Sequence, residues 1–454
     1  MPTKEYRPYT PDQLLILPPS LQEWLPEGHL AYFVRDLVRS FNLSAIEATY
    51  EDELRGGPPY RPEMMVTVLL YAYCVGVYSS RRIAQRLHED IAFRVLAAGN
   101  TPDFRTISDF RKRHLAALSG LFQQVLTLAQ EAGLVTLGHV ALDGTKIRAN
   151  ASKHKAMSYG RLRAEEERLA AEVAAMLQRA EDVDAAEDAL YGPDHSGDEL
   201  PAELCRREDR LRRIREAKAA LEARQRAAAE AERVRRAAEE PRGGRPPKPP
   251  RETPRDRDQY NFTDPDSRIM KDGQGAFVQG YNAQAVVDRT HQVVVAAEVT
   301  NEAPDVGHLV PMVEAMREDT GHDPRRLTAD AGYFSAANVA TLTARGIDAH
   351  IPPDKVKHTD RIPPAPRGRI PKGWSPKDRM RRKLQTKAGR AVYRRHKSIA
   401  EPVFGQIKAG RGFLRFLLRG LRKVRCEWKI VTMAHNIRKL FQARVPIARM
   451  AAGI

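Results

Sequence analysis

The sequence predicts an α/β protein in which helices flank a mixed five-stranded sheet, preceded by an all-helical domain. Residues 276–288 and 292–299 carry strand patterns separated by a short turn, which is typical of an antiparallel pair. The apolar run at 140–142 supplies an earlier strand, and strand and helix patterns alternate from 305 to 351. Residues 30–133 carry helical patterns instead.

The composition indicates a polyanionic partner. Lysine and arginine number 75 against 58 acidic residues, which leaves a formal net charge of +17 in 454 residues. Such an excess is typical of proteins that bind nucleic acid. An ordinary soluble protein with a basic surface is the alternative. A chain of this length has room for two or three domains.

Cysteine usage and hydropathy indicate the compartment. Cys74, Cys205 and Cys426 lie far apart, which argues against a disulfide framework or a structural zinc site and fits a reducing cytoplasm. The N-terminus lacks the apolar segment of a signal peptide, and no run approaches 18 apolar residues. We therefore expect a soluble cytoplasmic protein with no membrane partner.

Residues 1–134 are predicted to form an N-terminal helical domain. Pro62 opens an apolar helix, and Gly76 ends it before a helix over 81–88. Further helices are expected at 92–96, 106–114 and 115–133. Short helices with tight turns suit a helix-turn-helix-like DNA-binding unit, and a plain bundle with a solvated basic face is the alternative. The expected DNA contacts of this domain are Arg81, Arg82 and Arg111.

Two segments differ from the rest of the chain. Residues 153–258 are rich in Ala, Glu, Arg and Leu, which predicts a coiled-coil-like helical hairpin broken near 191–197 and followed by a basic linker at 241–250. This insertion interrupts a catalytic domain expected at 135–152 plus 259–445, and it adds no core strand. Residues 352–390 are rich in Pro, Lys and Arg and predict a disordered or DNA-tracking loop.

The order of elements resembles an RNase H-like core. Three antiparallel strands come first, and a strand at 326–330, a helix at 335–345 and a short strand at 346–351 follow. The first and fourth strands are neighbours in such a sheet. Acids that follow these two strands are therefore expected to lie close together.

Three acids stand at comparable places in this order. Asp143 follows the buried run of the first strand, Asp330 follows the fourth strand, and Glu401 enters a late helix. Each has a structural alternative. Asp143-Gly144 is a common turn pair, Asp330 is placed to cap a strand-to-helix junction, and Glu401 completes a capping box with Ser398. The three together favour chemistry, because clustered carboxylates repel one another unless cations neutralise them.

Oxygen-only ligands predict Mg²⁺ or Mn²⁺, with two ions expected. Two such ions can activate a hydroxyl and stabilise a leaving oxygen in phosphoryl transfer. No Ser-His-Asp or Cys-His arrangement competes, and no phosphate-binding glycine loop is present.

Residues 142–146, 329–333 and 400–408 resemble the three catalytic motifs of DDE transposases of bacterial insertion sequences, and residues 61–114 resemble the N-terminal domain found with them. The resemblance implies Asp143, Asp330 and Glu401 as catalytic metal ligands. It also implies cuts at terminal inverted repeats, strand transfer into target DNA, a homodimer or higher oligomer on double-stranded DNA, and association with the nucleoid.

The family signature around the glutamate is Tyr, two residues, Arg, three residues, Glu, six residues, Lys. Glu401 and Lys408 match this spacing, Lys397 replaces the arginine, and Tyr393 stands one place early. Lysine can still hold a phosphate, although as a point charge rather than a fork.

Basic residues near the acids are the expected DNA contacts. Lys146 and Arg148 alternate along one strand and so share a face. A later stripe recurs at helical spacing, for which a solvated helix face is the alternative. The full expected set in the catalytic domain is Lys146, Arg148, Tyr333, Lys397, Lys408, Arg411, Arg415, Arg419 and Arg422.

Two other functions fit the same residues. One is a catalytically inactive or co-opted transposase-derived DNA-binding protein. The other is an RNase H-like nuclease of another kind.

Overall fold

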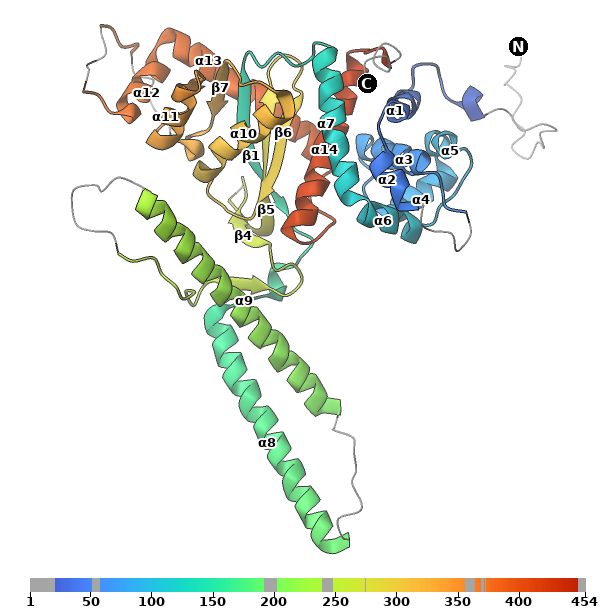
Figure 1. Ribbon diagram of the computed structural model, residues 1–454, viewed down its shortest axis with the longest axis vertical. Coiled ribbons are helices and arrows are strands. Elements are labelled where there is room, and N and C mark those ends of the chain that lie inside the picture. The colour runs from blue at the N-terminus through green and yellow to red at the C-terminus, as the bar shows by residue number, and fades with distance from the viewer. Residues whose placement is uncertain are drawn as a thin grey trace, which may run out of the picture.

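The computed structural model describes residues 21–50, 58–191, 202–238, 248–273, 275–355, 364–368, 371 and 373–447. It confirms a mixed α/β fold in which helices flank one curled sheet and a helical region precedes it (Figure 1). Among these residues, no helix combines the length and the apolar character needed to cross a membrane.

The main sheet has the strand order of an RNase H-like domain. β5 pairs antiparallel with β1, and β6 and β4 pair with its other edge. On the far side, β1 is parallel to β7, and β7 is parallel to β8. Five of these strands were predicted, whereas β4 is a short addition beside β5. The strands are β1 (Val140–Arg148), β4 (Arg268–Lys271), β5 (Phe277–Asp288), β6 (Val294–Thr300), β7 (Arg326–Ala329) and β8 (Asp348–His350).

The N-terminal helices form as the local sequence dictates. Pro62 occupies the first turn of α3, where its missing N–H is tolerated. The Asp103 carboxylate caps α6 by accepting from the N–H groups of Arg105 and Thr106. The helices are α1 (Leu30–Arg39), α2 (Ser44–Glu47), α3 (Pro62–Cys74), α4 (Ser80–Glu89), α5 (Ile91–Leu96), α6 (Phe104–Arg113) and α7 (Leu115–Glu131).

Helix α14 (Leu421–Gln442) joins the N-terminal helices to the sheet. It packs against α3, α7 and β6, and together with α7 it stands between the sheet and the other N-terminal helices (Figure 1). Trp428 of α14 is completely buried, and its Nε1 donates to the Gln284 carbonyl of β5 at 2.9 Å. One continuous hydrophobic core therefore extends from α1 to the sheet.

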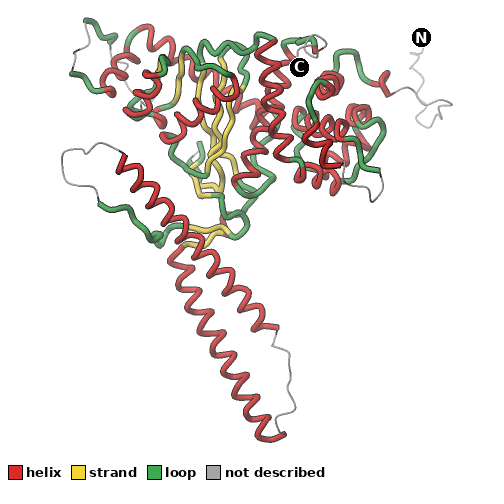
Figure 2. Tube along the Cα trace, viewed as in Figure 1, coloured by secondary structure: helices red, strands yellow, loops and turns green. Residues whose placement is uncertain are grey.

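The insertion forms a long helical hairpin of α8 (Tyr159–Tyr191) and α9 (Ala202–Ala238), which extends away from the sheet (Figure 2). Its small separate core includes Leu162 and Ile214. A two-stranded ribbon at its base, β2 (Ala156–Ser158) with β3 (Gln259–Asn261), does not join the main sheet. The predicted break at 191–197 and the linker at 241–250 fall largely outside the described residues.

Other helices flank the second half of the sheet. The prediction of a disordered loop over 352–390 was wrong for its C-terminal part, because Ser375 caps a helix at 376–385 and another begins at 387. Residues 356–363 lie outside the described part. The helices are α10 (Leu309–Thr320), α11 (Ala336–Ala344), α12 (Pro376–Gln385) and α13 (Lys387–Gly405).

Three arginines of the predicted helical stripe, Arg411, Arg415 and Arg419, do not lie in a helix, and only Arg422 does. Gly412 and Gly420 adopt φ of 71° and 83°, and α14 begins only at Leu421. The intervening chain lies along the end of β1, where the Phe416 N–H donates to the Arg148 carbonyl at 2.9 Å. Residues 413–419, hereafter the edge segment, therefore replace the predicted helix.

A buried glutamate holds the edge segment in place. The Glu427 carboxylate of α14 accepts hydrogen bonds from the N–H groups of Leu417 and Leu418 at 3.0 Å. Burial raises the pKa of Glu427 to about 7, and these two hydrogen bonds limit the rise. The folded protein therefore holds a proton on Glu427 at pH values at which the unfolded chain has lost it.

This proton makes the stability contribution of Glu427 depend on pH. Because the pKa is higher in the folded state, the contribution is complete below about pH 4.5 and is lost as pH rises through about 7. Between pH 5 and pH 8, we expect the wild type to lose roughly 2–3 kcal/mol of unfolding free energy relative to Glu427→Gln. Urea unfolding followed by tryptophan fluorescence measures the difference. The same difference at both pH values would contradict the prediction, since other titrating groups such as His435 are common to both proteins.

Candidate functional site

The position of Asp143 follows from how β1 is paired. β1 stays paired with β5 along its whole length, whereas its parallel pairing with β7 covers only Val140, Ala141 and Leu142. Asp143 therefore lies inside β1, at the level where β7 ends, and not at the end of its own strand as predicted. Asp330 follows the last residue of β7. Each of the two acids therefore follows the last residue of the parallel pairing between β1 and β7.

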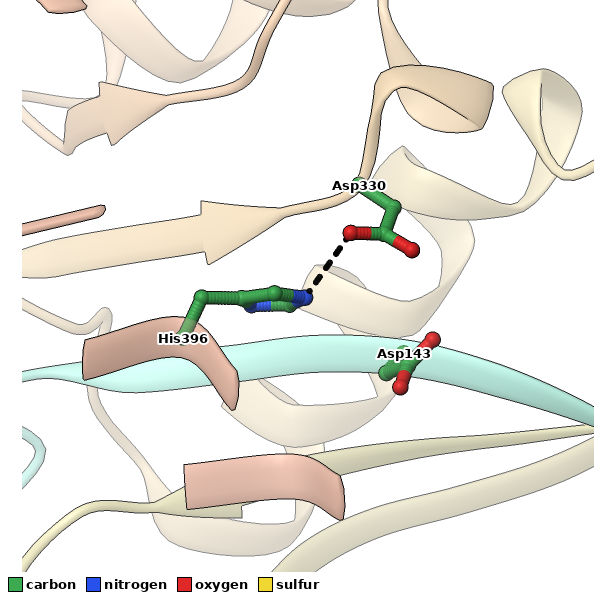
Figure 3. Close-up of side chains that lie close together, drawn as sticks. All are labelled: Asp143, Asp330 and His396. Carbon is green, nitrogen blue, oxygen red and sulfur yellow. Dashed lines mark ion pairs between the residues drawn. The ribbon is translucent and has the colours of Figure 1, made fainter. Parts of the chain in front are cut away.

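The two acids form a group with a histidine. Ligand atoms of Asp143, Asp330 and His396 all lie within 4.8 Å of one another. His396 reaches the acids from α13, and its Nε2 lies 3.2 Å from Asp330 Oδ1 (Figure 3). Tyr393, one turn earlier on α13, donates its hydroxyl to the same oxygen at 3.4 Å. The structure therefore confirms that the first and fourth strands bring their acids together.

The environment shifts the pKa values of the two carboxyl groups in opposite directions. Burial raises the pKa of Asp143 to about 6, and repulsion from Asp330 and Asp305 adds to the rise. The hydrogen bond from His396 lowers the pKa of Asp330, with smaller contributions from Tyr393 and Lys397. A half-buried carboxyl group with a raised pKa beside a second carboxylate is an arrangement that a divalent cation stabilises.

A polar network supports β1 behind the acids. Asp305 Oδ1 accepts from Asn282 Nδ2 at 2.7 Å and from Gln284 Nε2 at 3.0 Å. The buried Tyr333 hydroxyl donates to Gln284 Oε1. Lys146 adds its ammonium group to Asp305 at 3.3 Å and to the Ala303 carbonyl. Lys146, whose side chain is only 16% exposed, is therefore held by protein groups rather than left open to solvent.

Glu401 does not belong to the group of close ligand atoms, and its side chain is exposed. The alternative of a capping box is excluded, because α13 begins at Lys387 and Ser398 Oγ bonds the Arg395 carbonyl within the helix. Pro402, the residue after Glu401, also lies inside α13.

Lys408 lies against β1. It is part of a π-helical turn, η6 (Gln406–Gly410), so the seven residues from Glu401 to Lys408 do not form two regular α-helical turns. Its Nζ donates to Thr145 Oγ1 at 2.5 Å and to the Lys146 carbonyl at 3.2 Å. Burial lowers the pKa of Lys408, while Asp272 and Asp143 oppose this effect.

Three of the predicted DNA contacts are buried, and their polar atoms bind protein. Arg111 donates to the Tyr78 carbonyl at 2.8 Å, Arg411 donates to the Val431 carbonyl at 3.3 Å, and Tyr333 is held by Gln284. These side chains hold the fold together and do not face solvent. The predicted contacts that are exposed are Arg81, Arg82, Arg148, Lys397, Arg415, Arg419 and Arg422.

Sequence reasoning missed His396, and it quoted Tyr393 only for its motif spacing. A signal was available, since the two residues stand three apart and so share a helix face. Asp305 and Gln284 gave no such signal, because their contacts depend on how β5 and the turn before α10 meet.

The sheet order and the paired acids define an RNase H-like domain of the DDE type. Comparison with family models agrees: residues 249–437 match the transposase DDE domain, and residues 19–113 match a transposase domain designated DUF772. No curated protein and no solved structure matches the chain. The chain belongs to the DDE transposases of insertion sequences. Asp143 lies outside both matched ranges, so its position beside Asp330 is known from the structure alone.

Gly144 tests the network behind the acids. A Cβ at this position would lie 2.5 Å from Gln284 Nε2 and 3.1 Å from Asn282 Oδ1. We expect Gly144→Ala to displace the Gln284 amide, to destabilise the protein by about 1–3 kcal/mol and to lower any activity of the site. Thermal unfolding measures the loss. Gly138→Ala is the matched control, because its Cβ would meet only Thr136 Oγ1 at 3.7 Å. Equal effects of both substitutions would contradict the role of Gly144.

Proposed function

We propose that this transposase binds the terminal inverted repeats of its element, makes metal-dependent phosphodiester cuts at the element ends and joins the 3′-OH ends to target DNA. The observation that carries the proposal is the convergence of Asp143 and Asp330 from neighbouring strands, with ligand atoms within 4.8 Å. The exposed arginines of β1 and the edge segment beside them support a DNA substrate.

The residues present fit a site for divalent metal. The two carboxylates suit Mg²⁺ or Mn²⁺, whereas imidazole is more typical of other metals. Because His396 Nε2 already pairs with Asp330, we assign His396 to positioning that carboxylate. When bound, two such cations supply the positive charge that activates the attacking hydroxyl and stabilises the leaving oxygen.

We propose Glu401 as the third ligand. Lys397, one turn before it on α13, lowers the pKa of Asp330, and Lys408 beyond it contacts Thr145 of β1. Glu401 therefore stands between one residue that acts electrostatically on Asp330 and one that contacts the strand of Asp143. Its exposed carboxylate is free to turn toward the two acids when cations and DNA are bound.

The remaining residues of the site have roles that do not require the metal. Tyr393 and His396 fix the Asp330 carboxylate. The Asp305 network keeps β1 and β5 in register beside Asp143. Lys408, by bridging Thr145 and the Lys146 carbonyl, ties the turn η6 that follows α13 to the strand that carries the first acid.

Carboxamide substitutions test the catalytic assignment. We expect Asp143→Asn, Asp330→Asn and Glu401→Gln each to lower cleavage by more than about a hundredfold, because each removes a negatively charged ligand. Labelled DNA from the ends of the element, incubated with Mg²⁺ or Mn²⁺ and sized on a denaturing gel, measures cleavage. His396→Ala should cleave more weakly than wild type and recover at higher Mn²⁺.

The same assay separates the alternatives. Binding of end DNA without any cleavage by the wild type would identify a DNA-binding protein that has lost catalysis. Cleavage without joining of precleaved 3′-OH ends to a target plasmid would identify a nuclease of another kind. Normal cleavage by Asp143→Asn would overturn the assignment of the site.

Two arginines four residues apart test the DNA interface. Arg415 is exposed beside Arg148, whereas the Arg411 guanidinium is buried against the Val431 carbonyl. We expect Arg415→Ala to lower DNA affinity at every sequence and to reduce the salt dependence of log K by about one. We expect Arg411→Ala to cost about 1–3 kcal/mol of stability instead. Titrations at several salt concentrations and thermal unfolding measure both. A reduced salt dependence in Arg411→Ala with unchanged stability would contradict this distinction.

A further inference from the structure

The base of the hairpin contains a cavity that the catalytic site does not use. It has a volume of about 650 Å³, within the range of sites that take small molecules. Residues 154–161, 210–216 and 260–262 contribute its lining, and this region is hereafter the hairpin root. The β2–β3 ribbon forms its floor, where Met157 pairs with Tyr260 and the Phe262 N–H donates to the Lys155 carbonyl at 3.0 Å.

The lining of the hairpin root is strongly basic. Four lysine or arginine side chains face one acid, Glu216, which leaves an excess of three positive charges. Arg210 is partly neutralised by Glu165 at 2.7 Å. Among the described residues, Arg161 and Arg213 form no ion pair, and both are exposed. These charges suit a phosphate group. The four basic residues are Lys155, Arg161, Arg210 and Arg213.

Aromatic rings stand beside these cations. Phe262 is 38% exposed, and its ring meets that of Tyr260 edge-on with centroids 5.5 Å apart. A ring that keeps this much of its surface in water next to arginines offers a stacking platform to a base. Duplex phosphates alone need neither a cavity nor an exposed ring. The combination therefore favours a single nucleotide over the backbone of a paired duplex.

The hairpin root is connected to the catalytic strand. Ala156 lies 13 positions after Asp143, so the two are at most on the order of 45 Å apart. Between them, Asn150 bonds the Leu417 carbonyl at 2.7 Å and accepts from Arg419 Nε at 3.0 Å. The exposed Arg148 and the edge segment thus provide a basic path from the acids to the cavity. DNA of little more than one helical turn can reach both.

We propose that the hairpin root binds one unpaired nucleotide of the DNA substrate, with the base against Phe262 and its phosphate on Arg161 and Arg213. This inference rests on the proposed function, since it requires DNA as substrate. The helical insertion then has a role in holding DNA whose strands have separated. It differs from the catalytic centre in needing no metal.

A binding experiment with the full-length Asp143→Asn protein tests the proposal. The probes are two otherwise identical duplexes, one fully paired and one with a single 2-aminopurine bulge. We expect the bulged duplex to bind about tenfold more tightly, with quenched 2-aminopurine fluorescence. Phe262→Ala should abolish this preference and the quenching while the affinity for the paired duplex stays the same. Arg213→Ala should weaken the preference through the phosphate.

Matched controls keep the result specific. Phe277→Ala removes an aromatic side chain that is 67% exposed and lies outside the cavity, and Arg212→Ala removes an arginine paired with Asp209 on the same helix. Both should keep the preference, and unfolding midpoints confirm that each variant is folded. Binding of both duplexes with no difference between Phe262→Ala and Phe277→Ala would overturn the inference but leave the proposed function intact. Failure of the protein to bind any DNA would overturn the proposed function and the inference with it.

Discussion

The parallel pairing of β1 with β7 is the constraint on which the site depends. It ends at Leu142 and Ala329, so the next residue of each chain is an acid and the two acids must lie together. That proximity is unfavourable for two negative charges. The surrounding residues compensate unequally: His396 stabilises the charge of Asp330, whereas Asp143 is left half-buried with a raised pKa. The site therefore holds a deficit of positive charge that divalent cations can supply.

Helix α14 connects the sheet that carries the acids to the N-terminal helices. It packs on the sheet through Trp428 and on the N-terminal helices through its other side, and Glu427 ties down the edge segment. Gly76 adds a close contact from the other direction, since a Cβ there would lie 2.7 Å from the Arg411 carbonyl oxygen. The exposed arginines of the N-terminal helices and those beside β1 are thus carried on one packed unit. Under the proposed function, DNA bound by the first set of arginines is held at a fixed position relative to the acids.

The sequence predicted what local pattern and chain order determine. β1, β5 and β7 carry strong apolar patterns, and the acids after two of them identified one edge of the sheet. It did not predict the start of α13, which lies inside the loop expected over 352–390, or the non-helical chain at 411–420. The sequence also did not predict the burial of Arg111, because the residue type alone does not show whether an arginine is solvated or bound to a carbonyl group. His396 joined the site only through the packing of α13 on β7.

The distribution of charge within the fold explains how one basic chain can contain both a scaffold and an interface. In the hairpin many cations are balanced locally, as in the pairs of Arg207 with Glu172 and of Lys218 with Glu166. Such pairs at a surface add little stability and present little net field to a distant polyanion. Beside β1 the balance is absent, since Arg148 and Arg415 have no ion-pair partner among the described residues. The positive charges are therefore not distributed evenly over the described residues. Arg148 and Arg415 remain unbalanced beside the strand that leads from Asp143 to the hairpin root.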